Sequence, residues 1–509
     1  MNIKAFLEHH KLGSNPFRAE EARQDVVFER IEQSCHHPDF EKILGDLHAP
    51  SSSIVFGERG SGKTAIRLQL EQSIEAYNQA NPDTRCFPIF YDDFNSALSR
   101  YGRATGSRDA RGIKLKHFTL ADHMDAMLAG IVPRLVDQAI SGRRARESYI
   151  SAGLEDFRRR LLHCRPAVRA DLLLLAVCYD RPESAPDRLR RLKHLLRLGG
   201  ISAWNWFRGA FIVTMVVAIA YSFGYGIAAL RHGLDSIDLA WCILFWVCAS
   251  MPAVFLLLWL GTAVNVRLLA GRLNKAIRVL DRGTGSYSRG IRRIRLSDLH
   301  AAHLPRNRDE QPRYEAMDRL RRVLEPFGYR SIVVIMDRID EPASISGDVT
   351  RMRQFTWPML NNRFLQHPGF GIKLLLPLSL RQELLRERPE FFREARLDKQ
   401  NLVDRLSWSG AVLYDVCTSR LNACRPDDDP CSLMDLFDKD VQRSTVIDAL
   451  DQMHQPRDAF KFMYRLIREH CANVPHEESA WTISRVVLDL VRKQEVDRID
   501  EVLRDQRPG

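Results

Sequence analysis

Two long uncharged segments in the middle of the chain constrain its fold more than any other feature. The first, GAFIVTMVVAIAYSFGYGIAAL, covers residues 209–230, and the second, LAWCILFWVCASMPAVFLLLWLGTAV, covers residues 239–264. As helices they would extend roughly 33 and 39 Å, whereas the hydrocarbon core of a bilayer is about 30 Å thick. Core helices of soluble proteins are usually shorter and have a polar side. The two segments therefore predict a transmembrane helical hairpin, in which Pro252 bends the second helix without breaking it.

Charged residues on either side of the hairpin predict its orientation. The basic residues outside the two spans are Arg188, Arg190, Arg191, Lys193, Arg197 and Arg208 upstream, and Arg267, Arg272, Lys275 and Arg278 downstream. The short loop between the spans has one arginine against Asp235 and Asp238. Since positive flanks stay on the cytoplasmic side, both long arms and both termini should be cytoplasmic. Tryptophans 204, 206 and 241 suit positions at the membrane interface.

A glycine-rich motif precedes the hairpin. The sequence GERGSGKT (residues 57–64) matches G-x-x-x-x-G-K-[ST] in full, follows the strand-like run SSSIVF and opens a segment with helical spacing. Glycines allow successive backbone N–H groups to face phosphates, and the start of the helix adds a positive end. Lys63 would reach the β- and γ-phosphates of ATP, and Thr64 would place its hydroxyl on Mg²⁺. The residues predicted to bind the nucleotide are Gly57, Gly60, Ser61, Gly62, Lys63 and Thr64.

A second motif, VVIMDRIDE (residues 333–341), follows the hairpin. It ends a buried apolar run with Asp337, and Asp340 and Glu341 come three residues later. A carboxylate at the end of a strand beside the phosphate loop can bind Mg²⁺ directly or through water, which is the role we assign to Asp337. Asp340 and Glu341 are candidates to polarise the water that attacks the γ-phosphate.

Together these motifs resemble the additional-strand P-loop ATPases, and among them the KAP-type and STAND-like NTPases of bacteria, with the AAA+/origin-recognition group a near relative. The resemblance covers roughly residues 14–100 and 315–470. It implies an α/β fold in which helices flank a parallel P-loop NTPase sheet, a membrane hairpin is inserted between Walker A and Walker B, and an α-helical lid follows. Many of these ATPases have Glu directly after the Walker B Asp, whereas this chain has Arg338 there, so the acid–base assignment to Glu341 stays open.

The same resemblance implies further site residues. A polar residue that senses the γ-phosphate ends the strand beside the P-loop strand, and KLLLPLSLR places Ser379 there, with Arg381 as a cis arginine. The motif QPRDAF opens a helix with Arg457, similar to the lid arginine called sensor 2. An ordinary strand end and an ordinary helix start are equally open interpretations, because Pro456 and Asp458 suit a helix N-terminus regardless of function.

The organisation expected along the chain has seven parts. They are an N-terminal lead-in (1–50), the first part of the core (51–116), a helical insert (117–200), the hairpin (201–270), a mobile basic linker (271–314), the second part of the core (315–400), and the helical lid with C-terminal helices (401–509). The ten cysteines have no C-x-x-C pair and no zinc spacing, which indicates reduced thiols of a cytosolic body.

The net charge of +11 indicates anionic partners, and phosphates, nucleic acid and acidic lipid headgroups are all candidates. The arginines that could instead contact nucleic acid are Arg289, Arg292, Arg293 and Arg295. We expect an ATPase of slow turnover in the bacterial inner membrane that acts as a signalling or phage-exclusion switch. A membrane-tethered AAA+-like ATPase that acts on DNA and a non-hydrolysing, ATP-dependent scaffold are the alternatives. Protein partners and a homo-oligomer stay open.

Overall fold

A five-stranded, all-parallel sheet forms where the sequence has its uninterrupted apolar runs, which confirms the predicted α/β class. The strands are β1 (Ser53–Gly57), β2 (Arg85–Tyr91), β5 (Tyr329–Met336), β6 (Phe370–Pro377) and β7 (Asn401–Val403). Their order across the sheet is β2-β5-β6-β1-β7. Strands β1, β5 and β6 are buried almost throughout, as expected for parallel strands covered on both faces.

The computed structural model describes residues 1–19, 25–31, 36–106, 108–109, 112–141, 157–199, 202–232, 239–295, 302–426, 429–475 and 480–505. The chain divides into two units. Unit 1 is Met1–Ala80, Phe90–Asp92 and Ser331–Gly509, and unit 2 is Asn81–Ile89 and Asp93–Arg330.

In unit 1, helices follow the strands at their carboxyl ends. Helix α3 (Lys63–Ala80) follows β1, and α16 (Leu378–Leu385) follows β6. Between β5 and β6 lie α14 (Val349–Thr356) and α15 (Asn362–Leu365), and α17 (Pro389–Ala395) precedes β7. Strand β6 pairs in parallel with β1, so the chain segments that follow these two strands begin at the same edge of the sheet.

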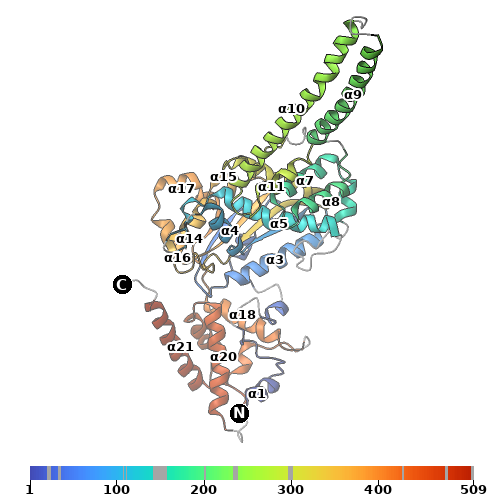
Figure 1. Ribbon diagram of the computed structural model, residues 1–509. Coiled ribbons are helices and arrows are strands. Elements are labelled where there is room, and N and C mark those ends of the chain that lie inside the picture. The colour runs from blue at the N-terminus through green and yellow to red at the C-terminus, as the bar shows by residue number, and fades with distance from the viewer. Residues whose placement is uncertain are drawn as a thin grey trace. The chain divides into compact units, whose positions relative to one another are not determined.

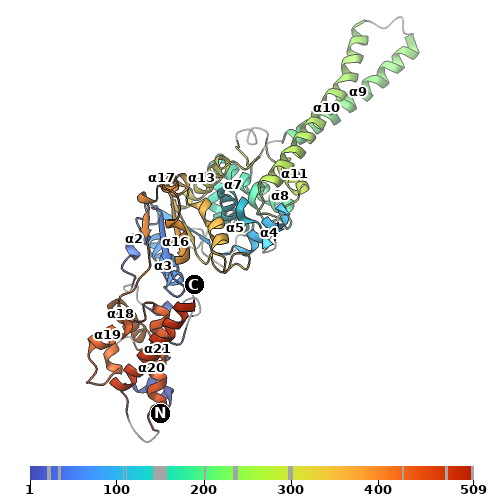
Figure 2. The ribbon, with the colours of Figure 1, turned by 90° about the vertical axis from the view of Figure 1, so that its left-hand side faces the viewer.

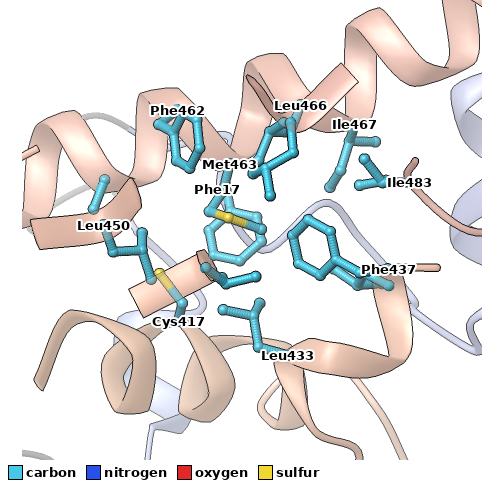
Figure 3. Packing of buried hydrophobic residues seen from close by; sticks show 14 of the residues in the cluster. Phe17, Cys417, Leu433, Phe437, Leu450, Phe462, Met463, Leu466, Ile467 and Ile483 are labelled. Atoms are coloured by element: carbon cyan, nitrogen blue, oxygen red, sulfur yellow. The ribbon is translucent and has the colours of Figure 1, made fainter. Parts of the chain in front are cut away.

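The C-terminal helices of unit 1 form a separate apolar core. They are α18 (Gly410–Asn422), α19 (Arg443–Asp451), α20 (Pro456–Asn473) and α21 (Arg485–Asp505). Figure 3 shows Phe17 among Cys417, Met463 and Leu466 in this core. The N-terminal helix α1 (Ile3–His9) contributes the fully buried Phe6 to the same cluster, and Figure 1 shows α1 beside α20. The first residues therefore belong to the helical domain, where the sequence predicted a separate lead-in over 1–50.

The described part of unit 2 is mainly helical. It also contains most of β2, the first residues of β5 and the short hairpin of β3 (Arg108–Asp109) and β4 (Gly112–Ile113). Its helices other than the long pair are α4 (Asn95–Thr105), α5 (Leu120–Ser141), α6 (Phe157–His163), α7 (Pro166–Tyr179), α8 (Ala185–Leu195), α11 (Thr284–Ile291) and α13 (Gln311–Leu324). Helices α5, α7 and α13 meet at a buried polar network, in which Asp125 accepts hydrogen bonds from Arg313 at 2.9 Å and from Tyr179 at 2.8 Å. Burial without this pairing would be costly for either charge, so the network specifies how the three helices pack.

The long pair of unit 2 consists of α9 (Ala203–His232) and α10 (Leu239–Ala276), which run side by side (Figure 2). Both helices contain a stretch long and apolar enough to cross a membrane, Ala203–Ile227 in α9 and Ile243–Ala276 in α10. The most apolar windows of the two helices are 0% and 6% buried, unlike the core helices of soluble proteins, which are mostly buried. Helix α10 continues through Pro252. The predicted spans 209–230 and 239–264 thus lie inside longer helices, and the loop residues 233–238 fall outside the described residues.

Three local predictions differ from the structure. Part of the segment 271–314, expected to be a mobile linker, forms α11, because Tyr287 and Ile291 are four residues apart and both bury their side chains. The strand expected over residues 371–380 ends at Pro377. Strand β7 replaces the expected helix at Asn401, where it pairs with β1. The eight cysteines whose side chains are described are all free.

Candidate functional site

The loop between β1 and α3 has a backbone that only glycine accommodates. Gly60 and Gly62 have φ angles of 96° and 91°, in the left-handed region that favours glycine. A β-carbon at Gly57 would lie 2.4 Å from the Ser61 Oγ, so the Ser61 side chain would have to move. The backbone thus requires glycine at positions 60 and 62, and the Ser61 side chain favours it at position 57. Because α3 begins at Lys63, the free backbone N–H groups of its first turn lie at the end of the loop.

The side chain of Lys63 lies over this loop. Its Nζ donates hydrogen bonds to the carbonyl oxygens of Gly57 at 2.8 Å and Glu58 at 2.7 Å. Burial lowers the pKa of Lys63 from its ordinary value, and the nearby carboxylates of Asp340, Asp337 and Glu58 act in the opposite direction. A half-buried ammonium above a curled backbone can bind an anion seated in the loop.

Thr64 and Asp337 meet although they are 273 positions apart in the sequence. The Thr64 hydroxyl donates to Asp337 Oδ2 at 3.1 Å. Asp337 follows the last residue of β5 and is 1% exposed. Burial raises the pKa of Asp337, against the backbone N–H of Arg338, the charge of Lys63 and the Thr64 hydroxyl, which lower it. A buried carboxylate beside a hydroxyl offers two oxygen ligands to a small hard cation.

These two oxygens fit Mg²⁺ only together with a bound phosphate. Among the described residues, no three His, Cys, Asp or Glu side chains come together in a way that could hold a metal ion. Magnesium commonly binds one or two protein oxygens and takes its remaining ligands from water and substrate phosphates. The pair of Thr64 and Asp337 beside the glycine loop therefore suits a metal that arrives with a nucleotide.

The two candidates for water activation lie in different surroundings. Arg338 has a φ of 64°, and its Nε donates to Glu341 Oε1 at 2.5 Å, so the carboxylate of Glu341 is ion-paired. Asp340 is the first of the carboxylates that raise the pKa of Lys63, ahead of Asp337 and Glu58. Glu341 is thus paired with the arginine, while the charge of Asp340 acts on Lys63 of the loop.

Two of the residues implied by the resemblance lie on α16. Ser379 is in the first turn of this helix, two positions after β6 ends at Pro377, and makes no side-chain hydrogen bond within the described part of the chain. Arg381 is paired with Asp404 at 3.1 Å. Within the described residues, no hydrogen bond or ion pair joins either side chain to the loop, and Ser379 begins a helix where a strand end was expected.

Arg457 lies beside the loop. A β-carbon at Gly60 would come within 3.2 Å of Arg457 Cβ and within 2.8 Å of Gln455 Oε1. Gln455 and Arg457 lie on either side of Pro456, where α20 begins and where proline suits the first turn. The start of α20 thus packs directly on the glycine loop.

Three further contacts to the loop were missed by sequence reasoning. Trp408 Nε1 donates to the Ser61 carbonyl at 2.8 Å. Glu58, at a variable position of the motif, accepts from Arg405 at 2.8 Å and from Gln455 at 2.5 Å. A tryptophan in the polar stretch RLSWSG was the one available signal, since an indole needs a hydrogen-bond partner when it is half-buried.

Comparison with known proteins gives no further assignment: no protein-family model, no curated protein and no solved structure matches this chain.

Proposed function

We propose that this chain is a membrane-anchored P-loop NTPase that binds ATP with Mg²⁺ in the loop of residues 57–64. The observation that carries the proposal is the hydrogen bond of 3.1 Å between Thr64 and Asp337, beside Lys63 and the glycine loop. Chance glycine-rich turns have no reason to bring a distant buried carboxylate to the hydroxyl of the motif.

Each residue has a role in this proposal. The N–H groups of the loop and of the first turn of α3 bind the phosphates, and Lys63 exchanges its two carbonyl partners for phosphate oxygens. Thr64 and Asp337 hold Mg²⁺, which neutralises charge on the β- and γ-phosphates when it is bound. Asp340 is the better candidate to orient water and accept its proton, because Glu341 is ion-paired with Arg338.

The contacts of the helical domain with the loop provide a route from nucleotide to output. Gln455 contacts Glu58, and Trp408 contacts Ser61. Arg457 lies against Gly60. A phosphate bound in the loop competes with these side chains for the same backbone groups. The start of α20 therefore has one set of contacts with the loop when phosphate is bound and another when it is absent. The role as a signalling or defence switch in a bacterial inner membrane, with the nucleotide site cytoplasmic, is the part of the proposal that rests on the resemblance and on the basic flanks of the hairpin.

Binding of the fluorescent nucleotide mant-ATP to the full chain in detergent tests the site. Lys63→Ala should weaken binding by at least about tenfold, because it removes a charge-assisted contact to phosphate. Lys439→Ala is the matched control, since Lys439 is exposed and far along the chain in the helical domain. Equal affinity of the Lys63→Ala variant and the wild type would rule out this site, as would binding that does not depend on Mg²⁺.

The pairing of Glu341 with Arg338 supports a second candidate, a switch that binds ATP without hydrolysing it. A single-turnover assay with radiolabelled ATP separates the two. Loss of turnover in Asp340→Asn, with turnover retained in Glu341→Gln, supports hydrolysis with Asp340 as base. Mg²⁺-dependent binding with no turnover in the wild type supports the second candidate.

A further inference from the structure

Three arginines of unit 2 line a pocket at the foot of the long helical pair. The pocket has a volume of about 520 Å³ and is lined by Arg267, Thr284, Gly285, Ser288, Arg289 and Arg292. Arg267 comes from α10, while the others come from α11 and the residue after it. The lining thus combines guanidinium groups with two hydroxyls.

These guanidinium groups have no acidic partner among the described residues. No ion pair joins Arg267, Arg289 or Arg292 to a carboxylate there, and the Nε of Arg292 is buried without a hydrogen-bond partner. Burial lowers the pKa of Arg292, and the charge of Arg267 lowers it further, so the two cations repel each other. The buried Arg313 of the same unit, by contrast, is neutralised by Asp125. Uncompensated positive charge around a pocket favours an anionic ligand.

The pocket lies where the uncharged part of α10 ends. Arg267 is three positions after Val264, the last residue of the second uncharged run. Arg292 stacks on Trp204, near the start of α9, at 3.9 Å from the ring centroid, and the Trp204 ring is 5.0 Å from that of Trp259. Tryptophan favours the level of the lipid headgroups, which bear the phosphates of a bilayer. The aromatic pair thus places Arg292 at the level of those phosphates when the hairpin spans a membrane.

A second basic pocket lies in the same unit. It has a volume of about 470 Å³, and its charged lining comes from Arg190, Lys193, His194, Arg197 and Arg293. Lys193 Nζ donates to the Arg293 carbonyl at 2.6 Å, which joins the end of α8 to the segment after α11. Both pockets therefore share the segment that contains Arg292 and Arg293. An anionic membrane surface would be attracted to this segment as a whole.

We propose that the pocket of Arg267, Ser288, Arg289 and Arg292 binds the phosphate of an anionic phospholipid headgroup. The inference rests on the proposed insertion of the hairpin and adds a specific lipid site to it. Paired guanidinium groups bind phosphate oxygens in bidentate fashion, and the Ser288 and Thr284 hydroxyls donate further hydrogen bonds. The ligand chemistry is shared with free phosphate and with nucleic acid, and the position at the end of the uncharged span favours lipid.

Native mass spectrometry of the full chain in detergent, titrated with phosphatidylglycerol and phosphatidylcholine, tests the proposal. The wild type should retain phosphatidylglycerol about tenfold more tightly than phosphatidylcholine, the size of one charge-assisted interaction. The double variant Arg267→Gln/Arg292→Gln should lose this preference. The matched control Arg208→Gln/Arg272→Gln removes the same charge from exposed arginines of α9 and α10 that lie outside the pocket. This control variant should keep the preference for phosphatidylglycerol.

Four outcomes overturn the proposal. They are equal retention of both lipids by the wild type, equal loss in the control variant, displacement of the lipid by millimolar inorganic phosphate, and its displacement by a short DNA duplex that the pocket variant no longer binds. Extraction of membranes with alkaline carbonate separates this test from that of the anchor. If the wild type is extracted, the proposed anchoring fails, whereas an integrated wild type without lipid preference refutes the lipid site alone.

Discussion

Replacement of Asp337 by asparagine should stabilise the protein without nucleotide and weaken its response to nucleotide. Because burial raises the pKa of Asp337 above its ordinary value of 3.8, the carboxyl stabilises the fold only in its protonated form. That contribution is fully present below the ordinary pKa and is lost as the pH rises through the folded-state pKa. Above the folded-state pKa the ionised carboxylate therefore opposes folding, and the uncharged asparagine should remove this cost.

The magnitude follows from two opposing contributions. The hydrogen bond from Thr64, at 3.1 Å, is long for a hydroxyl donor, so an amide acceptor in place of the carboxylate loses less than about 1 kcal/mol. Removing a charge that is 1% exposed gains more, since desolvation is the largest influence on Asp337. We expect a net stabilisation of about 1 kcal/mol, in the usual range for a favourable single substitution. In a domain of this size that raises Tm by about 2 °C.

Thermal unfolding of the full chain with and without Mg²⁺ and ATP measures both effects. A ligand at 100 times its Kd stabilises a protein by about 2.7 kcal/mol, and a tenfold loss of affinity removes about 1.4 kcal/mol of this. The variant should therefore have a higher Tm than the wild type without nucleotide, and its Tm should rise less when Mg²⁺ and ATP are added. Its advantage without nucleotide should shrink as the pH is lowered through the raised pKa of Asp337, because the wild-type carboxyl then becomes protonated.

Asp25→Asn is the matched control. Asp25 is also buried, at 5% exposed, and lies in the same unit, but it is ion-paired with Arg420 at 2.6 Å. Its replacement leaves a buried guanidinium without its counter-charge and should destabilise by about 3 kcal/mol, with an unchanged response to nucleotide. A lower Tm for Asp337→Asn without nucleotide, or an unchanged nucleotide response, would refute the reasoning.

Three further substitutions or measurements test other parts of the structure. Gly60→Ala places a β-carbon against the start of α20 and adds about 1–2 kcal/mol of backbone strain, so ATP affinity should fall. The control Gly347→Ala has the same kind of backbone, at φ 75°, but open space around the new methyl group, so it should lower only Tm. Equal ATP affinities of the two variants would contradict the contact between Gly60 and α20. Val247→Arg on α10 should reduce the fraction of protein that stays in the membrane after extraction with alkaline carbonate, since arginine at the centre of a span costs about 2.5–3.5 kcal/mol. The control Val486→Arg on α21 should leave this fraction unchanged. Burial raises the pKa of Cys178 to about 12, so iodoacetamide should react slowly with this thiol in the native protein. Labelling is measured by mass spectrometry, and a rate equal to that in the unfolded chain would contradict the burial of Cys178 in unit 2.

The strands and the glycine loop could be predicted because their signals are local. A run such as SIVVIM has no charge, and it forms most of β5. The loop motif contains its own geometric requirement, since Gly60 and Gly62 occupy the left-handed region. The approach of Thr64 to Asp337 was predictable for a related reason, since both residues follow the carboxyl ends of parallel strands.

Elements that depend on partners distant in the sequence could not be predicted. Strand β7 has three residues, too few for a pattern, and exists because β1 offers an open edge. The chain turns after Pro377, so Ser379 begins a helix and does not end a strand. The leucines on either side of Ser379 suit a strand as well as a helix, so the sequence did not show where the strand ends. The contact of Trp408 with Ser61 depends on how the helical domain packs on the loop, which no local pattern contains.

The burial of Phe6 and Phe17 in the C-terminal helical core has a consequence for biosynthesis. Arg420 donates to the Pro16 carbonyl across 404 positions, so the N-terminal segment leaves the ribosome long before its partners exist. During translation this segment stays apolar and exposed while the hairpin is being synthesised. The apolar core that Phe6 and Phe17 share with the C-terminal helices can therefore be completed only after the last helices emerge.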